Sequence, residues 1–299
     1  MNFWALGKNI YNMSNPREVR RCITFCVRAF FHRSQMVNLH QFFQQSPLLQ
    51  QVAEAYPFVY EQPTRAFFYH RSDFQERIAL MKGHMSFLAA HIRKEYVLAL
   101  YQAKPIPLWS GMKCVEQQFS ASLFFEPGQR KEGLLSIVLW LGDMPFYQII
   151  FWINTAQDGT PAMWIGAMQG PNMTHARDMV KLVTKACHGC RTKNMAVYIA
   201  QIIARRLRLH HIYAVTNEGY YANNHLRIDR KLKTDFSEFW QESGGWRTTD
   251  ARFMELPLTE KRKAMEEVPT RKRAVYRRRF AMLDEIDGEI TEVLDKIVY

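Results

Sequence analysis

Two hydrophobic patterns divide the chain near residue 104. Before that point, apolar residues recur at steps of three and four from Arg77 to Tyr101, which is the spacing of one face of a helix. The stripe consists of Ile78, Met81, Met85, Leu88, Ile92, Tyr96 and Ala99. Pro105 and Pro107 then end the pattern. Residues 1–104 are therefore predicted to form a mostly helical N-terminal region.

After Val115 the pattern becomes that of short strands separated by turns. Stretches rich in β-branched and aromatic residues alternate with Pro-Gly, Gly-Asp and Asp-Gly signals, so neighbouring strands are expected to be antiparallel. These predicted strands are Phe119–Phe125, Leu134–Leu141, Phe146–Asn154 and Ala162–Met168. Further on, the pattern predicts helices within His175–Arg208 and Asp235–Ser243, and strands at His211–Thr216 and Trp246–Leu256.

The last part of the chain, residues 261–299, is predicted to be a charged helical tail interrupted at Pro269. Residues 105–260 then form an α+β domain between this tail and the helical region 1–104. The predicted fold class is α+β, with a helical N-terminal region followed by a mixed, mainly antiparallel sheet with flanking helices.

The net charge of +12 is concentrated in two places. Basic residues dominate in Arg177–Arg208 and Lys261–Arg279, whereas acidic residues dominate in Asp284–Asp295. Such a field favours an anionic ligand, an acidic carrier protein or an anionic membrane leaflet, with nucleic acid the least favoured partner. Alternatively, the acidic end of the tail pairs with its basic part, and the two form a self-contained helical cap.

The five cysteines form no disulfide framework, which favours a reducing cytoplasm. Arginines interrupt the early apolar residues, so no signal-peptide core is predicted. The most apolar run, Leu134–Ile153, contains Gly142, Asp143 and Pro145 and is better explained by two strands than by a membrane span. The chain is predicted to be cytoplasmic, with peripheral contact to the inner membrane left open.

The turn Gln169-Gly170-Pro171-Asn172 lies between a predicted strand and a predicted helix. Backbone N–H groups at such a turn favour an anion, and Gly170 lets a phosphate approach the backbone. These four residues form the first part of the predicted cofactor site. The alternative is an ordinary turn in which Asn172 or Thr174 caps the helix.

The segment Cys187-His188-Gly189-Cys190 joins two predicted helices. A zinc site needs four ligands, and no second closely spaced Cys/His pair lies nearby, so no metal site is predicted. Gly189 is expected to end the first helix in the left-handed conformation. His188, Arg191 and Lys193 either complete the predicted cofactor site by binding an anion, or are solvated.

Three polar and aromatic residues, Asn217, Tyr220 and Tyr221, follow the strand predicted at His211–Thr216. A phenol can donate a proton to a leaving thiolate when its neighbours lower its pKa, so Tyr220 and Tyr221 are the candidate catalytic residues. The alternative is that both cover the sheet edge with aromatic surface. Asn217 and Trp240 are the candidate substrate-binding residues, and the sequence indicates no general base.

With these motifs, the chain resembles the VirK/YbjX family of enteric and related proteobacteria. Relatives often carry Leu and Pro around the arginine of the His-Gly segment, where this chain has Cys190 and Thr192. The resemblance implies a role in virulence or the envelope, including tolerance of antimicrobial peptides, without a settled biochemical activity. It rests on Ile165–Pro171, His188-Gly189 with Arg191 and Lys193, Ala214–Asn217, Phe239–Glu242 with Gly244-Gly245, Leu256-Pro257 and Tyr276–Arg279.

The order of the predicted elements is also similar to that of GNAT acyltransferases, with an extra helix between His175 and His188. This similarity implies that the strand-to-helix turn holds a cofactor pyrophosphate. The leading hypothesis is a GNAT-like acyltransferase, or a degenerate relative, with acyl-CoA or an acyl carrier protein as donor and no required cofactor. The alternative is a non-enzymatic virulence or stress factor whose basic face binds a protein, an anionic membrane or RNA.

Overall fold

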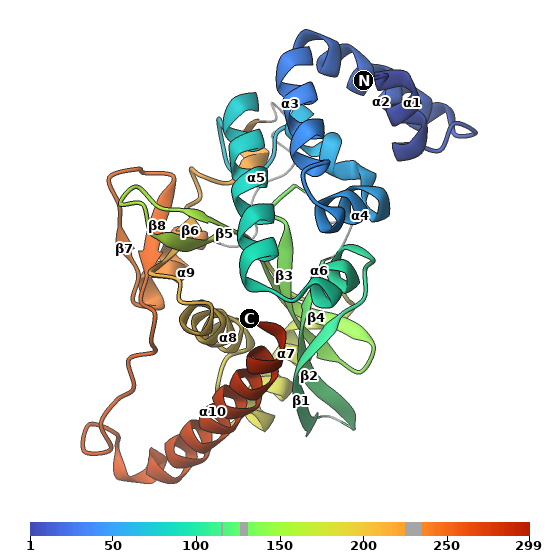
Figure 1. The fold of residues 1–299 in the computed structure, drawn as a ribbon. Helices are drawn as coiled ribbons and strands as arrows, with labels where there is room; N and C mark the ends of the chain where they lie inside the picture. The colour runs from blue at the N-terminus through green and yellow to red at the C-terminus, as the bar shows by residue number, and fades with distance from the viewer. Residues whose placement is uncertain (115, 126–130, 225–234) are drawn as a thin grey trace.

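A set of helices precedes a single sheet in the structure, a computed structural model that describes residues 1–114, 116–125, 131–224 and 235–299. The helices before the sheet are α1 (Phe3–Ile10), α2 (Pro16–Phe31), α3 (Arg33–Phe43), α4 (Pro47–Ala55), the 3₁₀ helices η1 (Pro57–Tyr60) and η2 (Gln62–Thr64), α5 (Phe74–His91) and α6 (Lys94–Tyr101). Figure 1 shows α1 to α4 gathered at one end of the molecule, away from the last helix, whereas α6 lies near the end of that helix.

Eight strands form the sheet, in the order β1-β2-β3-β4-β5-β6-β8-β7. Neighbouring strands are antiparallel except β5 and β6, which are parallel. The predicted α+β class with a mainly antiparallel sheet is therefore confirmed. The strands are β1 (Ile106–Cys114), β2 (Gln117–Phe124), β3 (Leu135–Leu141), β4 (Met144–Thr155), β5 (Pro161–Gln169), β6 (His211–Val215), β7 (Trp246–Arg247) and β8 (Phe253–Leu256).

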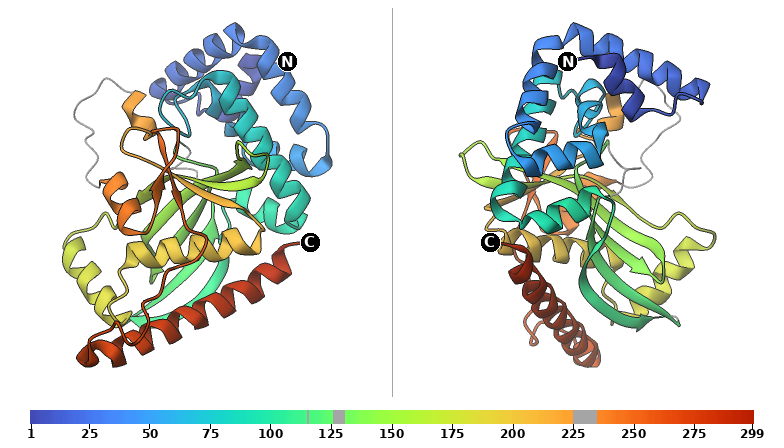
Figure 2. Two further views of the ribbon diagram at one scale, coloured as in Figure 1. Left: turned by 90° about the vertical axis from the view of Figure 1, so that its left-hand side faces the viewer. Right: turned by 45° about the vertical axis from the view of Figure 1, so that its right-hand side comes forward.

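Helices cover both faces of the sheet, as Figure 2 shows. Helix α8 packs on β3, β4 and β6, and α10 packs on α8 and β1. On the other side α5 packs on β4, where the Nδ1 atom of His84 accepts a hydrogen bond from the backbone N–H of Ile153 at 3.0 Å. The remaining elements are α7 (Ala176–Ala186), α8 (Thr192–Arg206), η4 (Tyr221–Asn224), α9 (Phe236–Glu242) and α10 (Thr270–Ile297).

Three predicted helix boundaries are wrong. The stripe from Arg77 to Tyr101 belongs to two helices, because Ile92 is extended and pairs with Val298. The residue before α7 is His175, in the left-handed conformation with no side-chain cap, so neither proposed cap residue is used. The last helix begins only after Pro269, and residues 261–269 of the predicted helical tail contain no helix.

The acidic end of α10 pairs mainly with α8 rather than with the basic part of the tail. Asp287 lies 2.6 Å from Arg205, and Asp295 pairs with Arg206. One ion pair does join the acidic and basic parts of the tail, as the alternative prediction has it, because Arg262 lies 2.7 Å from Asp284. The acidic residues therefore fix α10 along α8.

Of the helices that the structure describes, none combines the length and apolarity needed to cross a bilayer.

Candidate functional site

The parallel strands β5 and β6 separate at their carboxyl ends. Their pairing runs from Ala162 and His211 to Ile165 and Ala214, while β5 continues to Gln169. The carboxyl ends of parallel strands are where ligands commonly bind in sheets that contain helical crossovers. This divergence therefore places the candidate site at the edge that the sequence motifs indicate.

Trp240 of α9 closes part of this divergence. The indole is fully buried, and its Nε1 donates a hydrogen bond to the Val215 carbonyl at 2.8 Å. That carbonyl belongs to the last residue of β6, one position beyond the last pair with β5. Trp240 thus holds α9 against the end of β6, and its predicted contact with substrate remains a prediction.

A buried carboxyl group, Glu132, lies at the same point. A Cβ atom at Gly166 of β5 would come within 1.8 Å of the Glu132 carbonyl oxygen, so the chain before β3 crosses β5 in direct contact. Burial raises the pKa of the Glu132 carboxyl to about 7, against the opposing effects of Lys131 and of a hydrogen bond with Tyr221. A carboxyl group with this pKa can exchange a proton near neutral pH.

The two candidate catalytic tyrosines are adjacent but lie in different surroundings. Tyr221 is buried and is the tyrosine that hydrogen-bonds Glu132. Tyr220 pairs with Tyr69 in an isolated β-bridge, and its ring packs edge-on against Phe236, with centroids 5.6 Å apart. The geometry therefore distinguishes Tyr221 as the phenol beside an acid–base group, although catalysis by either tyrosine remains a prediction.

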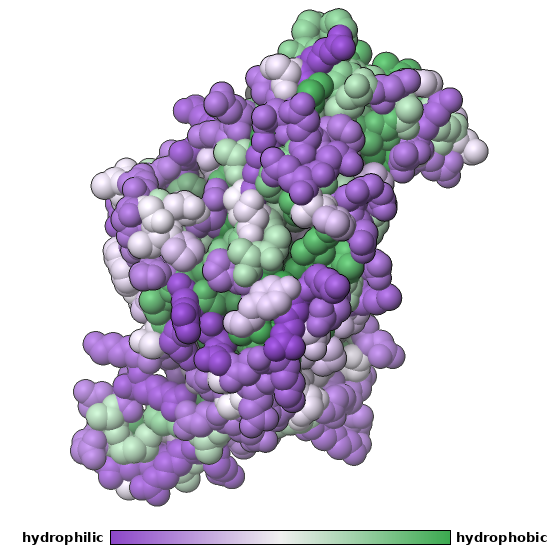
Figure 3. Space-filling view, viewed as in Figure 1, coloured by the Kyte–Doolittle hydropathy of each residue, from purple (hydrophilic) through white to green (hydrophobic). Residues whose placement is uncertain are grey.

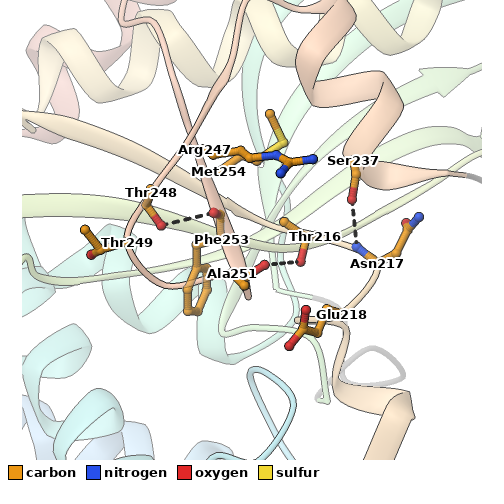
Figure 4. A pocket seen from close by; sticks show the side chains of 10 residues that line it. All are labelled: Thr216, Asn217, Glu218, Ser237, Arg247, Thr248, Thr249, Ala251, Phe253 and Met254. Carbon is orange, nitrogen blue, oxygen red and sulfur yellow. Dashed lines mark hydrogen bonds between the residues drawn. The ribbon is translucent and has the colours of Figure 1, made fainter.

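A cavity of about 480 Å³ opens at the end of β6 (Figure 4). The volume is in the range of small-ligand pockets. Hydroxyl groups dominate its polar lining, with Arg247 and Glu218 as the charged groups, so it is suited to a polar ligand. The lining residues are Thr216, Asn217, Glu218, Ser237, Arg247, Thr248, Thr249, Ala251, Phe253 and Met254.

Asn217 joins this cavity to the start of α9. Its Oδ1 atom accepts the backbone N–H of Phe236 at 2.8 Å, and its backbone N–H donates to the Ser237 hydroxyl at 3.2 Å. A hydrogen bond from the Glu238 backbone, and next a hydrogen bond from the Asn217 side chain, lower the pKa of Asp235. The carboxamide therefore positions α9 as well as lining the cavity, and its contact with substrate remains a prediction.

Asn217→Asp is expected to lower the free energy of unfolding by about 1–3 kcal/mol. The new carboxylate keeps an acceptor for Phe236 but loses the donor to Asp235 and places two like charges together. Urea unfolding measured at pH 7 checks this expectation. Asn9→Asp, on the exposed side of α1, is the control. Equal stability of the two variants would contradict the anchoring role of Asn217.

The predicted cofactor residues of the turn after β5 lie beside β4. A Cβ atom at Gly170 would lie 3.1 Å from the Tyr147 ring, and Gln169 pairs with Gln148 across the two strands. Pro171 and Asn172 follow without regular structure before α7 begins at Ala176. None of the four lines the 480 Å³ cavity, and their contact with a cofactor remains a prediction.

The other predicted cofactor residues meet at the start of α8. Arg191 and Lys193 lie 3.5 Å and 3.3 Å from the Glu242 carboxylate. Arg279 of α10, which the sequence analysis did not select, donates to the His188 carbonyl at 3.1 Å. Gly189 has φ = +75°, as predicted for the end of α7. Three cations and one carboxylate therefore surround this helix start, and an anion there would compete with Glu242.

The His211 imidazole lies between two carboxylates that are distant from it in the sequence. Its two ring nitrogens lie 2.6 Å from Glu255 and 2.9 Å from Asp158. Burial lowers the pKa of the His211 imidazole, but the hydrogen bonds with these carboxylates outweigh that effect and raise it. His211 is the first residue of β6, at the opposite end of this strand from the 480 Å³ cavity. These contacts join β6 to β8 and to the turn between β4 and β5.

Comparison with known families identifies the chain. The model of a protein family of unknown function, DUF535, matches residues 14–292. The chain belongs to the DUF535 family. This is the VirK/YbjX family, so the resemblance predicted from the motifs is confirmed.

Curated relatives of this DUF535 chain include the uncharacterized protein YbjX of Escherichia coli K12, 33% identical over 178 residues. That match covers 58% of this chain and about half (53%) of YbjX. An uncharacterized protein of Haemophilus influenzae is 27% identical over 97% of this chain and 95% of its own length. A Mannheimia haemolytica protein named membrane protein LapB is 24% identical over 65% of this chain and 82% of its own length. No solved structure matches the chain.

Proposed function

We propose that this DUF535 protein is a GNAT-like acyltransferase that takes its acyl group from acyl-CoA or an acylated carrier protein. The observation that carries the proposal is Glu132, a buried carboxyl hydrogen-bonded with Tyr221 where β5 and β6 separate. Sheet order supports it as well, since antiparallel strands lead into a helical crossover and one parallel pair. The family membership is consistent with the proposal but does not specify this activity.

The two side chains have complementary roles in the proposed reaction. An acceptor amine or hydroxyl attacks the thioester carbonyl, and Glu132 takes the proton that the acceptor loses. The carbon–sulfur bond breaks as the new acyl bond forms, and Tyr221 supplies a proton to the leaving thiolate. A base with a pKa of about 7 is ionised in a useful fraction at neutral pH and still accepts a proton readily.

The donor phosphates are proposed to bind near the start of α8. Arg191, Lys193 and Arg279 supply positive charge there, and the turn containing Gly170 precedes the same crossover. A phosphate is a stronger partner for arginine and lysine than a half-exposed carboxylate is, so it would displace Glu242. An acidic carrier protein would meet the same positive charge.

The test is native mass spectrometry of the purified protein with a panel of CoA thioesters and with an acylated carrier protein. Gly170→Arg is expected to lose donor binding, because the new side chain occupies the turn beside Tyr147. Gly288→Arg carries the same charge change at an open position of α10 and is expected to bind as the wild type does. Unchanged binding by Gly170→Arg would exclude this donor site.

Each outcome for the wild-type chain has a direct meaning. A mass increase equal to a CoA thioester, or a complex with the carrier protein, supports the acyltransferase. Absence of both complexes at high donor concentration overturns it and favours the non-enzymatic alternative, in which the basic face binds a partner. The melting temperature of each variant, measured alongside, separates loss of binding from loss of fold.

A further inference from the structure

Helix α2 carries apolar side chains on two opposite faces. One face, with Cys22, Phe25 and Ala29, is buried. The other face exposes the apolar stripe Ile23, Val27, Phe30 and Phe31, whose exposed fractions are 50%, 50%, 64% and 78%. Steps of four, three and one residues keep these four side chains on one side of the helix. Exposure of two phenylalanines on one turn indicates a surface that another molecule covers.

The hairpin of α1 and α2 presents this stripe at the end of the molecule. The two helices pack closely, since the Cys26 thiol contacts the Phe3 carbonyl at 3.4 Å and Gly7 lies against Cys22. Figure 1 shows the pair at the extremity of the helical region, and Figure 3 shows apolar surface gathered there between polar patches. Trp4 of α1, 44% exposed, adds an aromatic side chain to the same hairpin.

Positive charge borders the apolar stripe. Helix α2 contains four arginines and a single acidic residue, Glu18, which pairs with Arg21. Arg17 and Arg20 are exposed on α2, and Arg33 is exposed just after it. On a helical projection Arg20 lies in line with the stripe, toward the start of the helix, and Arg17 lies beside the stripe. The α1–α2 hairpin therefore combines the apolar stripe with exposed arginine side chains.

We propose that the α1–α2 hairpin docks the protein onto the surface of an anionic lipid bilayer. Ile23, Val27, Phe30 and Phe31 enter the interface between headgroups and acyl chains, and the arginines contact lipid phosphates. An exposed tryptophan on the same hairpin, Trp4, suits the headgroup level of a membrane. The 16 residues of α2 with their four arginines fit a helix lying in the interface plane rather than a spanning one.

A membrane is favoured over a protein partner by charge and shape. Protein interfaces concentrate their apolar residues in a patch whose core is depleted of charge. Here the apolar stripe shares its side of the helix with Arg20 and is bordered by Arg17, which matches an amphipathic helix on anionic lipid. The proposal does not depend on the acyltransferase activity, because α2 and Glu132 are in different parts of the structure.

Sedimentation with vesicles tests the docking of the intact protein. Wild-type protein is expected to sediment with phosphatidylcholine vesicles that contain one quarter phosphatidylglycerol, and to be released as salt is raised. Phe30→Ser with Phe31→Ser is expected to reduce binding roughly tenfold or more, because two exposed aromatic side chains no longer enter the interface. Arg17→Gln with Arg20→Gln is expected to weaken binding to the anionic vesicles alone.

Leu182→Ser with Tyr299→Ser is the matched control, because both residues are exposed apolar side chains far along the chain from α2. This control is expected to bind vesicles as the wild type does. Absence of wild-type sedimentation at low salt, or an equal loss of binding in the control, overturns the proposal. If the wild type instead forms a dimer and does not bind vesicles, and the Phe30/Phe31 variant is a monomer, the apolar stripe is a self-association surface. Circular dichroism confirms that every variant is folded.

Discussion

Glu132→Gln is expected to be more stable than the wild-type chain above pH 7, by about 3 kcal/mol at most. The pKa of Glu132 rises from its ordinary 4.5 to about 7 on folding, chiefly because the side chain is buried. Between these values the folded chain keeps a proton that the unfolded chain has released. Stability therefore falls as pH rises from about 4.5 to about 7 and then levels off. Glutamine removes this loss.

Urea unfolding at intervals from pH 4.5 to pH 8 measures the effect. The wild-type and Glu132→Gln curves should converge at the acidic end and separate as pH rises. Glu266→Gln, at an exposed position, is the control and should run parallel to the wild type throughout. A Glu132→Gln curve that also runs parallel to the wild type would show that Glu132 titrates normally.

The same substitution tests the proposed chemistry. Loss of a general base typically lowers the rate by a factor of about 10²–10⁴, so Glu132→Gln should have lost nearly all acyl transfer while being the more stable protein. Wild-type activity should rise with pH through about 7, as the carboxyl group ionises. An active Glu132→Gln enzyme would exclude this base even if donor binding is intact.

Gly166→Ala is expected to lower the free energy of unfolding by about 3 kcal/mol or more. The added methyl group would lie 1.8 Å from the Glu132 carbonyl oxygen and 2.9 Å from the Trp152 ring. A backbone segment must therefore move away from β5. Movement of this segment also admits water to the Glu132 carboxyl, so the pH dependence of stability should become smaller at the same time.

A glycine in open space provides the control for this prediction. Gly288, inside α10, has nothing within 4 Å of an added Cβ atom. Gly288→Ala should therefore stabilise the protein by about 0.5–1 kcal/mol, because alanine favours the helix. Opposite signs for the two substitutions are expected in urea unfolding. A Gly166→Ala variant as stable as the wild type would contradict the close contact between Gly166 and the Glu132 carbonyl.

Local patterns in the sequence predict most of the sheet. Turn signals and β-branched stretches locate β2, β3, β4 and β5, and the helix predicted within Asp235–Ser243 is α9. The sequence does not predict strand β1, because Pro105 and Pro107 are interpreted as a boundary between regular elements. Pro107 is tolerated because β1 is an edge strand, where one side of the backbone needs no partner.

The candidate site is only partly predictable from local patterns. Strand ends and turns indicate Asn217, Tyr220 and Tyr221, and the turn after β5, because these signals are contained in short windows. Glu132 depends on contact with Gly166, 34 positions away, and Arg279 on the packing of α10 at the start of α8. The one local signal near Glu132 is Gly133, whose Cβ would lie 2.7 Å from the Phe151 carbonyl oxygen.

The pairing of the C-terminal residues with the joint between α5 and α6 has a consequence for synthesis on the ribosome. Arg93 donates a backbone hydrogen bond to Ile297, and Tyr299 donates one to His91. The joint therefore stays open in a nascent chain until residues 297–299 have emerged from the exit tunnel. Until then α10 cannot cover β1 and α8, and their apolar surface is exposed to chaperones and proteases. Completion of this fold therefore waits for α10, which is far from α5 and α6 in the sequence.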